Sequence, residues 1–254
     1  PNLSFADLNK TTSDIPFNLN SSVNKGGSNG SLTFTIPNPA DASVATISGS
    51  TLTIVGAGTA TINVSLAESA IYTSKTTSAT LTVNKVAPSL SLAALTKTTL
   101  TSPFSLTPSV TTNSLGTLTF TSSDPSVATI SGSIVTIVGA GTATINVSLA
   151  ETAIHNSRSI TATLTVNKAL PNLSLSIPTK TTVDPSFNLM DLVTKDGSGL
   201  LTFTIPNPAH ASVATISGST LTIVGAGTAT INVSLAASED GIYLSRNINA
   251  TLNV

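Results

Sequence analysis

The chain has 254 residues, of which 40% are hydrophobic, 8% are charged and 4% are aromatic, and it contains no cysteine and no tryptophan. Its net charge of −1 excludes the basic surface of a nucleic-acid-binding protein and the polybasic face of a protein bound to anionic membranes. The lack of cysteine excludes disulfides and thiolate metal sites, and no apolar run reaches the roughly eighteen residues of a membrane-spanning helix.

Threonine, serine and β-branched aliphatic residues are abundant, which favours strands over helices. Lys10, in a Lys-Thr-Thr triplet, and Phe17 come early in the chain. The alternation of apolar residues with threonine over 32–36 then predicts a half-buried antiparallel strand. Two further strands are predicted at 44–47 and 51–55, with Gly49 supplying the positive φ of the hairpin between them.

The segment Gly56-Ala57-Gly58 is a turn between strands. A phosphate-binding loop is the alternative, but no Gly-Lys-Ser/Thr follows and no helix begins there. Alternation over 60–66 and 79–83 predicts the last two strands, giving about seven strands in the first 85 residues.

The sequence then repeats. Residues 43–67 recur at 126–150 and 212–236, and only two positions differ among the three occurrences. We predict three domains, at residues 1–85, 86–168 and 169–254, which we call the first, middle and third copies. Pro1-Asn2-Leu3-Ser4 is in phase with Pro171-Asn172-Leu173-Ser174, so we expect further copies of the repeat in a longer chain.

Seven short strands with closely spaced turns favour a two-sheet Greek-key β-sandwich of the immunoglobulin type over a barrel. The linkers, residues 83–88 and 166–171, contain no glycine, and each contains a proline. Such linkers predict a stiff, elongated rod of about 35 Å per copy, or about 100–130 Å for three.

Two segments of the middle copy, Asp124–Gly132 and Val135–Ile145, resemble bacterial immunoglobulin-like repeats of surface adhesins and of invasin- or intimin-like stalks. The resemblance extends to the matching segments of the other two copies and is weaker in the opening third of each. It implies an immunoglobulin-like fold and an extracellular structural or adhesive role.

Catalysis requires titratable groups that converge, and the two histidines, His155 and His210, lie in different copies. His155 corresponds to Tyr72 and Tyr243, and His210 corresponds to Asp41, an interchange typical of solvated loop tips. The acidic residues are scattered and form no calcium-binding motif. We therefore expect no enzyme activity, no cofactor and no metal. Lys10, Lys97 and Lys180 recur in all copies, either as exposed strand-edge lysines or as cross-linking residues.

Tyr72 and Tyr243 are the only tyrosines, and each lies in the loop before the last strand of its copy. Aromatic side chains in a loop are candidates for a ligand-binding patch, but they also serve as a hydrophobic plug that closes the end of a sandwich. Both alternatives stay open from the sequence.

Nine Asn-x-Ser/Thr triplets occur in the chain, a number that a composition rich in these residues also produces by chance. Asn63, Asn146 and Asn232 occupy the same position in the three copies. They point outward from a strand whose neighbouring residues point inward, so they are the candidate glycosylation sites.

The sequence thus predicts a non-enzymatic structural segment of an extracellular surface protein: tandem modules that form an adhesin stalk or fibre. Two alternatives remain. One is a self-assembling subunit of an extracellular filament, sheath or viral appendage, whose partners are identical chains. The other is a module that binds a host-surface carbohydrate or protein. All three place the chain outside the cell.

Overall fold

The computed structural model describes all 254 residues. The chain consists of strands and five short 3₁₀ helices, so the all-β prediction is confirmed. No helix has the length and apolar character needed to cross a lipid bilayer.

The first copy contains β1 (Ser4–Phe5), β2 (Leu8–Thr11), β3 (Phe17–Asn18), β4 (Val23–Asn24), β5 (Leu32–Thr35), β6 (Ala45–Ser48), β7 (Thr51–Ile54), β8 (Gly58–Leu66) and β9 (Lys75–Asn84). The middle copy contains β10 (Leu90–Leu92), β11 (Leu95–Thr98), β12 (Phe104–Ser105), β13 (Val110–Thr112), β14 (Leu118–Ser122), β15 (Ala128–Ser131), β16 (Ile134–Ile137), β17 (Gly141–Leu149) and β18 (Arg158–Asn167). The third copy contains β19 (Leu173–Leu175), β20 (Phe187–Asn188), β21 (Val193–Lys195), β22 (Leu201–Thr204), β23 (Ala214–Ser217), β24 (Thr220–Ile223), β25 (Thr228–Leu235) and β26 (Arg246–Asn253). The 3₁₀ helices are η1 (Leu19–Ser22), η2 (Pro39–Ser43), η3 (Thr107–Ser109), η4 (Leu189–Leu192) and η5 (Pro208–Ser212).

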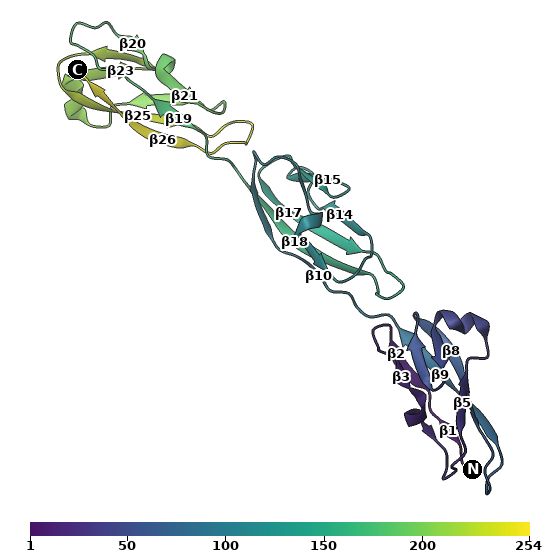
Figure 1. Cartoon of the computed structure of the whole chain (residues 1–254). Helices are drawn as coiled ribbons and strands as arrows, with labels where there is room; N and C mark the ends of the chain where they lie inside the picture. Colours follow the sequence, from purple (N-terminus) through teal and green to yellow (C-terminus); the bar gives the residue numbers. More distant parts are fainter. The chain divides into compact units, whose positions relative to one another are not determined.

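Two main sheets form the first copy (Figure 1). One has the order β2-β9-β8-β5, and the other has the order β3-β7-β6; a short β1–β4 pair completes the sandwich. The long strands β8 and β9 are antiparallel, with Gly58 opposite Val83 and Leu66 opposite Lys75. β5 and β6 are edge strands of the two main sheets, and each pairs with another strand on one side only.

Strict alternation along β8 builds the core of the first copy. Its buried residues are Ala60, Ile62, Val64 and Leu66, and the residues between them face outward. On β9, Leu81 is fully buried in the same cluster. Burial of each large aliphatic side chain contributes about 1.5–3 kcal/mol, so the inward face of these strands supplies the main stabilisation. The predicted inward and outward faces of this strand are confirmed.

Glycine permits the hairpin between β6 and β7. Gly49 has φ = 62°, and its equivalents Gly132 and Gly218 have φ = 60° and 63°. Because this left-handed conformation is strained for residues with a Cβ, the Ser-Gly-Ser sequence correctly predicts the hairpin.

The structure differs from the prediction in two places. Residues 39–43 form η2, stabilised by the Asn38 side chain, which accepts a hydrogen bond from the Ala40 backbone. Val44 has a helical conformation at the end of η2, so the strand begins at Ala45 rather than at the predicted Val44. In addition, β2 runs parallel to β9, a pairing that was not predicted from the sequence.

The residues group into two compact units. One comprises residues 1–92, 107–119 and 147–160, and the other comprises residues 93–106, 120–146 and 161–254. The first unit holds the entire first copy and the second holds the entire third copy. Residues of the middle copy are divided between them, so the three domain limits, 1–85, 86–168 and 169–254, remain a prediction.

Most strand pairs recur in the other copies, but the third copy has no strand equivalent to β2 and β11. In the third copy the sheets are β22-β25-β26, β20-β24-β23 and β19-β21. In the middle copy β12-β16-β15 and β10-β13 pair, and β11 lies parallel to β18 with Leu95 opposite Leu164. The repeated sequence therefore produces repeated strand pairing.

Candidate functional site

The loop before the last strand carries both tyrosine candidates. We call residues 67–74, 150–157 and 236–245 the junction loops. A backbone hydrogen bond closes each loop: Ser69 donates to the Tyr72 carbonyl oxygen at 2.8 Å, and Thr152 donates to that of His155 at 2.9 Å. In the third copy Ser238 donates to the carbonyl oxygen of Tyr243 at 3.2 Å. The first two loops thus close in the same way, and the third, which is two residues longer, closes through the equivalent carbonyl group.

The tyrosine side chains lie against a loop of their own copy, the one between β4 and β5 for Tyr72 and the one between β21 and β22 for Tyr243. A Cβ built on Gly197 would stand 2.9 Å from Cδ2 of Tyr243, so the ring covers this glycine. A Cβ on Gly27 would lie 3.8 Å from the hydroxyl of Tyr72. Both tyrosines are half-buried. This packing favours the plug over an open aromatic platform, and ligand binding by Tyr72 and Tyr243 stays a prediction.

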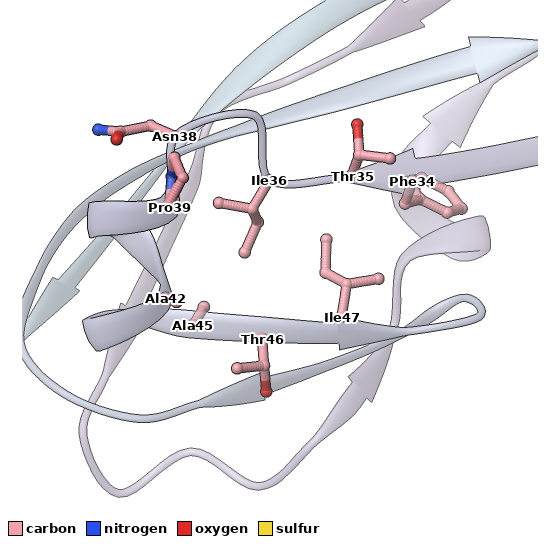
Figure 2. A pocket seen from close by; sticks show the side chains of 9 residues that line it. All are labelled: Phe34, Thr35, Ile36, Asn38, Pro39, Ala42, Ala45, Thr46 and Ile47. Carbon is pink, nitrogen blue, oxygen red and sulfur yellow. The ribbon is translucent and has the colours of Figure 1, made fainter.

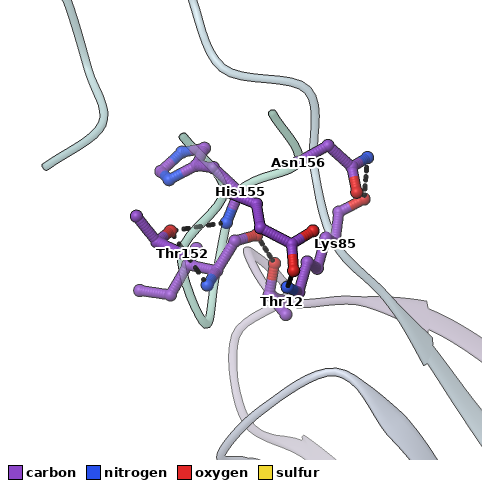
Figure 3. Close-up of polar contacts among 7 residues, drawn as sticks. Thr12, Lys85, Thr152, His155 and Asn156 are labelled. Atoms are coloured by element: carbon purple, nitrogen blue, oxygen red, sulfur yellow. Dashed lines mark hydrogen bonds and ion pairs between the residues drawn. The ribbon is translucent and has the colours of Figure 1, made fainter. Parts of the chain in front are cut away.

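The junction loop of the middle copy contacts the linker that precedes this copy (Figure 3). The Val86 backbone N–H donates to the Ile154 carbonyl oxygen at 3.1 Å, and the Asn156 N–H donates to the Val86 carbonyl oxygen at 2.9 Å. Val86 and His155 thereby form an isolated parallel β-bridge. One residue of the linker, Val86, thereby pairs with the loop as a residue of an added β-strand would.

A threonine of the first copy completes this contact. Thr12 Oγ1 donates to the same Ile154 carbonyl oxygen at 2.6 Å, although the two residues are 142 positions apart in the chain. Each carbonyl oxygen has two lone pairs, and here both accept a hydrogen bond. We call Thr12, the linker and this junction loop the first junction.

Polar side chains surround the first junction. Asn156 Nδ2 donates to the Lys85 carbonyl oxygen at 3.4 Å, and Lys85 Nζ lies 3.2 Å from Oε1 of Glu151. The glutamate side chain is 65% exposed, and an exposed ion pair of this kind stabilises little. Arg158 Nη1 donates to the Pro88 carbonyl oxygen at 2.6 Å, which fixes the far end of the linker.

The third copy repeats this arrangement at the second junction. Ala169 N–H donates to the Ile242 carbonyl oxygen at 2.9 Å, and Leu244 N–H donates to the Ala169 carbonyl oxygen at 2.8 Å. Thr99 Oγ1 donates to Ile242 at 2.6 Å, and Arg246 Nη1 donates to the Pro171 carbonyl oxygen, also at 2.6 Å. Because Tyr243 replaces His155 without changing these bonds, the contact depends on backbone groups and on the threonine.

The sequence contains a signal for the junctions. Thr12 and Thr99 each end a Lys-Thr-Thr triplet, which recurs at residues 180–182. The pattern marks an equivalent position, but it does not reveal that the third residue of the triplet bonds to a loop of the next copy.

Each lysine of these triplets lies over an aromatic ring. Lys10 Nζ is 4.3 Å from the ring centroid of Phe17, and the distance is 4.7 Å both for Lys97 over Phe104 and for Lys180 over Phe187. Cation–π contacts at exposed sites contribute about 0.5–1 kcal/mol. The lysine and phenylalanine that recur together in the sequence are therefore contact partners.

His210 caps a strand rather than occupying a free loop tip. Its Nδ1 accepts a hydrogen bond from the Thr230 N–H at 3.1 Å, as Asp41 Oδ2 does from Thr61 N–H at 2.9 Å in the first copy. These N–H groups lie on β25 and β8, beyond the ends of the neighbouring edge strands β22 and β5. The side chain supplies the acceptor that the sheet lacks there.

We expect His210→Asp to stabilise the third copy by about 1 kcal/mol. Since Nδ1 of His210 is an acceptor, Nε2 carries the proton and faces Asn207 Nδ2, another donor, at 3.3 Å. In the first copy the equivalent Asn38 Nδ2 donates to Asp41 Oδ1 at 2.8 Å. Urea unfolding measures the change, and the reciprocal Asp41→His should cost a similar amount. Equal stability of both variants and the parent would contradict this account.

One acidic group of the junction loops has a shifted pKa. The hydroxyl of Ser238 and the backbone N–H of Ile242 both donate to Asp240 Oδ1, and these bonds, the Ser238 bond first, lower the pKa of Asp240 below its usual value. A carboxylate with a lowered pKa stabilises the folded loop above its unfolded pKa, near 3.9, and this contribution is lost as the pH falls through the folded pKa.

We therefore expect the Asp240 carboxyl to titrate at a lower pH than a peptide aspartate, and Ser238→Ala to raise its midpoint. The Ile242 amide should lose protection from exchange as the pH falls through the lowered pKa of Asp240, where this carboxylate takes up its proton. A pH titration followed by NMR checks both statements. An unchanged midpoint in the Ser238→Ala variant would show that the hydroxyl has no role.

The candidate glycosylation sites lie on the outer face of their strands. Asn146 is exposed, whereas Asn63 and Asn232 are half-buried. Asn232 Nδ2 donates to Oδ1 of Asn249 on the neighbouring strand at 2.9 Å. Glycosylation of Asn63, Asn146 and Asn232 remains a prediction, and mass analysis of these peptides from native material tests it.

A shallow pocket lies between the edge strands β5 and β6 (Figure 2). Its walls are mainly apolar, from Phe34, Ile36 and Ile47, and both ends of the Asn38 amide already bond to neighbouring residues. The third copy has the equivalent pocket beside Phe203. No group of three or more His, Asp or Glu side chains is placed to hold a metal ion.

Comparison with known proteins agrees with the resemblance in the sequence. Residues 112–151, from the end of β13 into the junction loop of the middle copy, match the family model described as "Intimin, immunoglobulin-like domain". This segment of the middle copy is similar to the intimin immunoglobulin-like domain. The resemblance stated from the sequence is thereby confirmed over this segment.

No curated protein sequence matches the chain. Among solved structures, Drosophila N-cadherin EC1-3 is 10% identical over 99% of this chain and 98% of its own, with a TM-score of 0.35. Surface layer protein SbsC, domains 1-6, is 17% identical over 100% of this chain and 40% of its own, with a TM-score of 0.33. The SusE-like polysaccharide binding protein BT4661 from Bacteroides thetaiotaomicron is 12% identical over 100% and 60%, with a TM-score of 0.28.

Proposed function

We propose that the chain is a non-enzymatic structural segment of an extracellular surface protein, in which tandem immunoglobulin-like modules form a stalk or fibre. The observation that carries the proposal is the repeated junction. At both linkers a threonine hydroxyl and a linker N–H bond to one isoleucine carbonyl oxygen, Ile154 or Ile242. A linker held on both sides restricts the motion between modules, and this restriction is what a stalk requires.

The distribution of chemical groups supports the same function. The only ion pair is Lys85 with Glu151, no group of acidic or histidine side chains is arranged for a metal, and the pockets beside β5 and β22 are mainly apolar. The threonine-rich outer faces offer few charged groups to a ligand. Recurrent structure, rather than a single reactive site, is the conspicuous property of the chain.

Thr12→Val is the direct test of the junction. The chain has no cysteine, so spin labels at exposed positions 80 and 163 can report the distance between two modules through Thr80→Cys and Thr163→Cys. We expect a narrow distance distribution in the parent chain and a broader one after Thr12→Val, because the Ile154 carbonyl oxygen loses one of its two hydrogen bonds.

Thr182→Val is the matched control, because this exposed threonine has no hydrogen bond in the structure and belongs to the third copy. It should leave the distribution unchanged. Equal widths in the parent and the Thr12→Val variant would remove the basis of the stalk proposal.

Assembly of identical chains into a filament or sheath is the second candidate. The free edges of β5 and β6 favour it, because an unpaired edge strand can pair with another chain. Sedimentation of the purified chain over a range of concentrations distinguishes the two: an isolated stalk stays monomeric.

A further inference from the structure

The junction loop of the first copy has the same length and the same closing hydrogen bond as that of the middle copy, but no linker lies on it. Ser69 closes this loop through the Tyr72 carbonyl oxygen as in the middle and third copies. The Ile71 carbonyl oxygen and the Thr73 N–H, however, have no hydrogen bond. These two groups correspond to the acceptor and donor that bind Val86 and Ala169 in the occupied loops.

The exposure of the isoleucines follows the same difference. Ile71 is 84% exposed, whereas Ile154 in the first junction is 47% exposed and Ile242 in the second is half-buried. An exposed isoleucine beside a free donor and a free acceptor is an incomplete β-bridge site. The two occupied loops show what such a site binds: a linker residue and the threonine of the preceding copy.

The complementary half lies in the third copy. Thr182 ends the third Lys-Thr-Thr triplet, and it is exposed, whereas Thr12 and Thr99 are half-buried in their junctions. The turn around it is preformed, because Asp184 Oδ2 accepts from the Thr181 N–H at 2.6 Å, as Asp14 does from the Thr11 N–H at 2.9 Å. Only the isoleucine carbonyl oxygen is missing.

We propose that the first-copy junction loop is the docking site for a further copy of this repeat, joined to Pro1 by a linker like Asn167-Lys168-Ala169-Leu170. In this junction the hydroxyl equivalent to Thr182 donates to the Ile71 carbonyl oxygen, and the linker residue equivalent to Ala169 pairs with Tyr72. The inference rests on the proposed stalk function and names the partner of one surface. One position departs from the pattern: Lys75 stands where the occupied copies have Arg158 and Arg246.

Hydrogen exchange in an extended chain tests the proposal. The extended chain consists of residues 169–254, the linker Asn-Lys-Ala-Leu and then residues 1–254. Residues 68–75 occur once in it and form a peptide that mass spectrometry distinguishes from those of the other loops. We expect exchange of the Thr73 amide to slow by about tenfold relative to the chain of 254 residues, because its N–H gains an acceptor.

Thr182→Val in the added copy alone is the matched variant. This variant should make the Thr73 amide exchange faster than in the unmodified extended chain. It should not unfold any module, since Thr182 is exposed and lies outside the core. Peptides that contain Val86 and Asn156 occur once and serve as internal references for an occupied loop, and both amides should be slow in every chain.

The outcomes separate the two proposals. If the reference amides are slow but the Thr73 amide exchanges equally fast with and without the added copy, the docking site is refuted and the stalk function stands. If the reference amides are also fast, the junctions do not persist in solution, and both proposals are refuted.

Discussion

Leu81→Ala is expected to lower the free energy of unfolding of the first copy by about 2–5 kcal/mol. Leu81 has 0% exposure and lies on the central strand β9, between the inward residues of β8 and those of β2. Truncation removes most of a buried side chain and leaves a cavity in a core of apolar side chains, in a chain that has no cysteine to form a disulfide.

Calorimetry of the whole chain then tests the three predicted domains. If residues 1–85 fold independently, Leu81→Ala lowers one transition and leaves the others in place. Leu164→Ala, at the equivalent buried position of the middle copy, should lower a different single transition. A shift of two transitions by Leu164→Ala would favour cooperative units like those of the contact clusters, which divide the middle copy.

Thr80→Ala is the control, since Thr80 is the exposed neighbour of Leu81 on the same strand. Its side chain makes no core contact, so a change within about 0.5 kcal/mol is expected. A loss comparable to that of Leu81→Ala would mean that the outer face of β9 contributes as much as the core.

The strands were predictable because their burial pattern is regular. Along 60–66 every second residue is apolar, and the structure buries Ala60, Ile62, Val64 and Leu66. Period-two alternation predicts a strand with one buried face, and the threefold repetition carries that result to the other copies. Glycine in a Ser-Gly-Ser segment likewise determines the hairpin at Gly49 through its backbone conformation.

The remaining features depend on contacts between distant residues. Nothing local in the sequence indicates that β2 pairs in parallel with β9, since β2 has a single apolar residue, Leu8, and no alternation that marks its direction. The short helix η2 depends on Asn38 as a cap, and a single asparagine before proline is also typical of an ordinary turn.

The junctions were the part of the site that the sequence predicted least well. Their acceptors are backbone carbonyl oxygens of Ile154 and Ile242, and every residue has such a group. Tyr72 and Tyr243 indicated the correct loops for a different reason. Their aromatic side chains were candidates for ligand binding, but these side chains lie against their own copy and take no part in the junction hydrogen bonds. The threonines of the Lys-Thr-Thr triplets carried the more specific signal.

Gly30 is, after Leu81, the second position at which we expect a substitution to cost much stability, although its backbone φ is not positive. Gly30 precedes β5, and a Cβ built on it would stand 2.2 Å from the Ala67 carbonyl oxygen. The same distance is 2.1 Å at Gly116 and 2.0 Å at Gly199, so all three copies require this close approach of two backbones. The neighbouring residues differ among the copies, which makes the shared glycine recognisable in the sequence.

Gly30→Ala should therefore destabilise the first copy by about 1–3 kcal/mol, the usual cost of forcing an extra carbon into a packed site. The obstacle is a backbone oxygen, so no side-chain rotation relieves the contact. Separation of the strands there also strains the hydrogen bond from the Ala67 N–H to the Ser31 carbonyl oxygen, now 2.9 Å. Urea unfolding of the variant, followed by circular dichroism, measures the loss.

Gly49→Asn distinguishes this steric effect from the general cost of replacing glycine. A Cβ at Gly49 meets no atom within 4 Å, and asparagine tolerates its positive φ better than other residues with a Cβ do. We expect this variant to lose less than about 1 kcal/mol. If both variants lose the same amount, chain entropy rather than the approach of Gly30 to Ala67 explains why glycine occurs at both positions, and the tight contact in all three copies has no energetic importance.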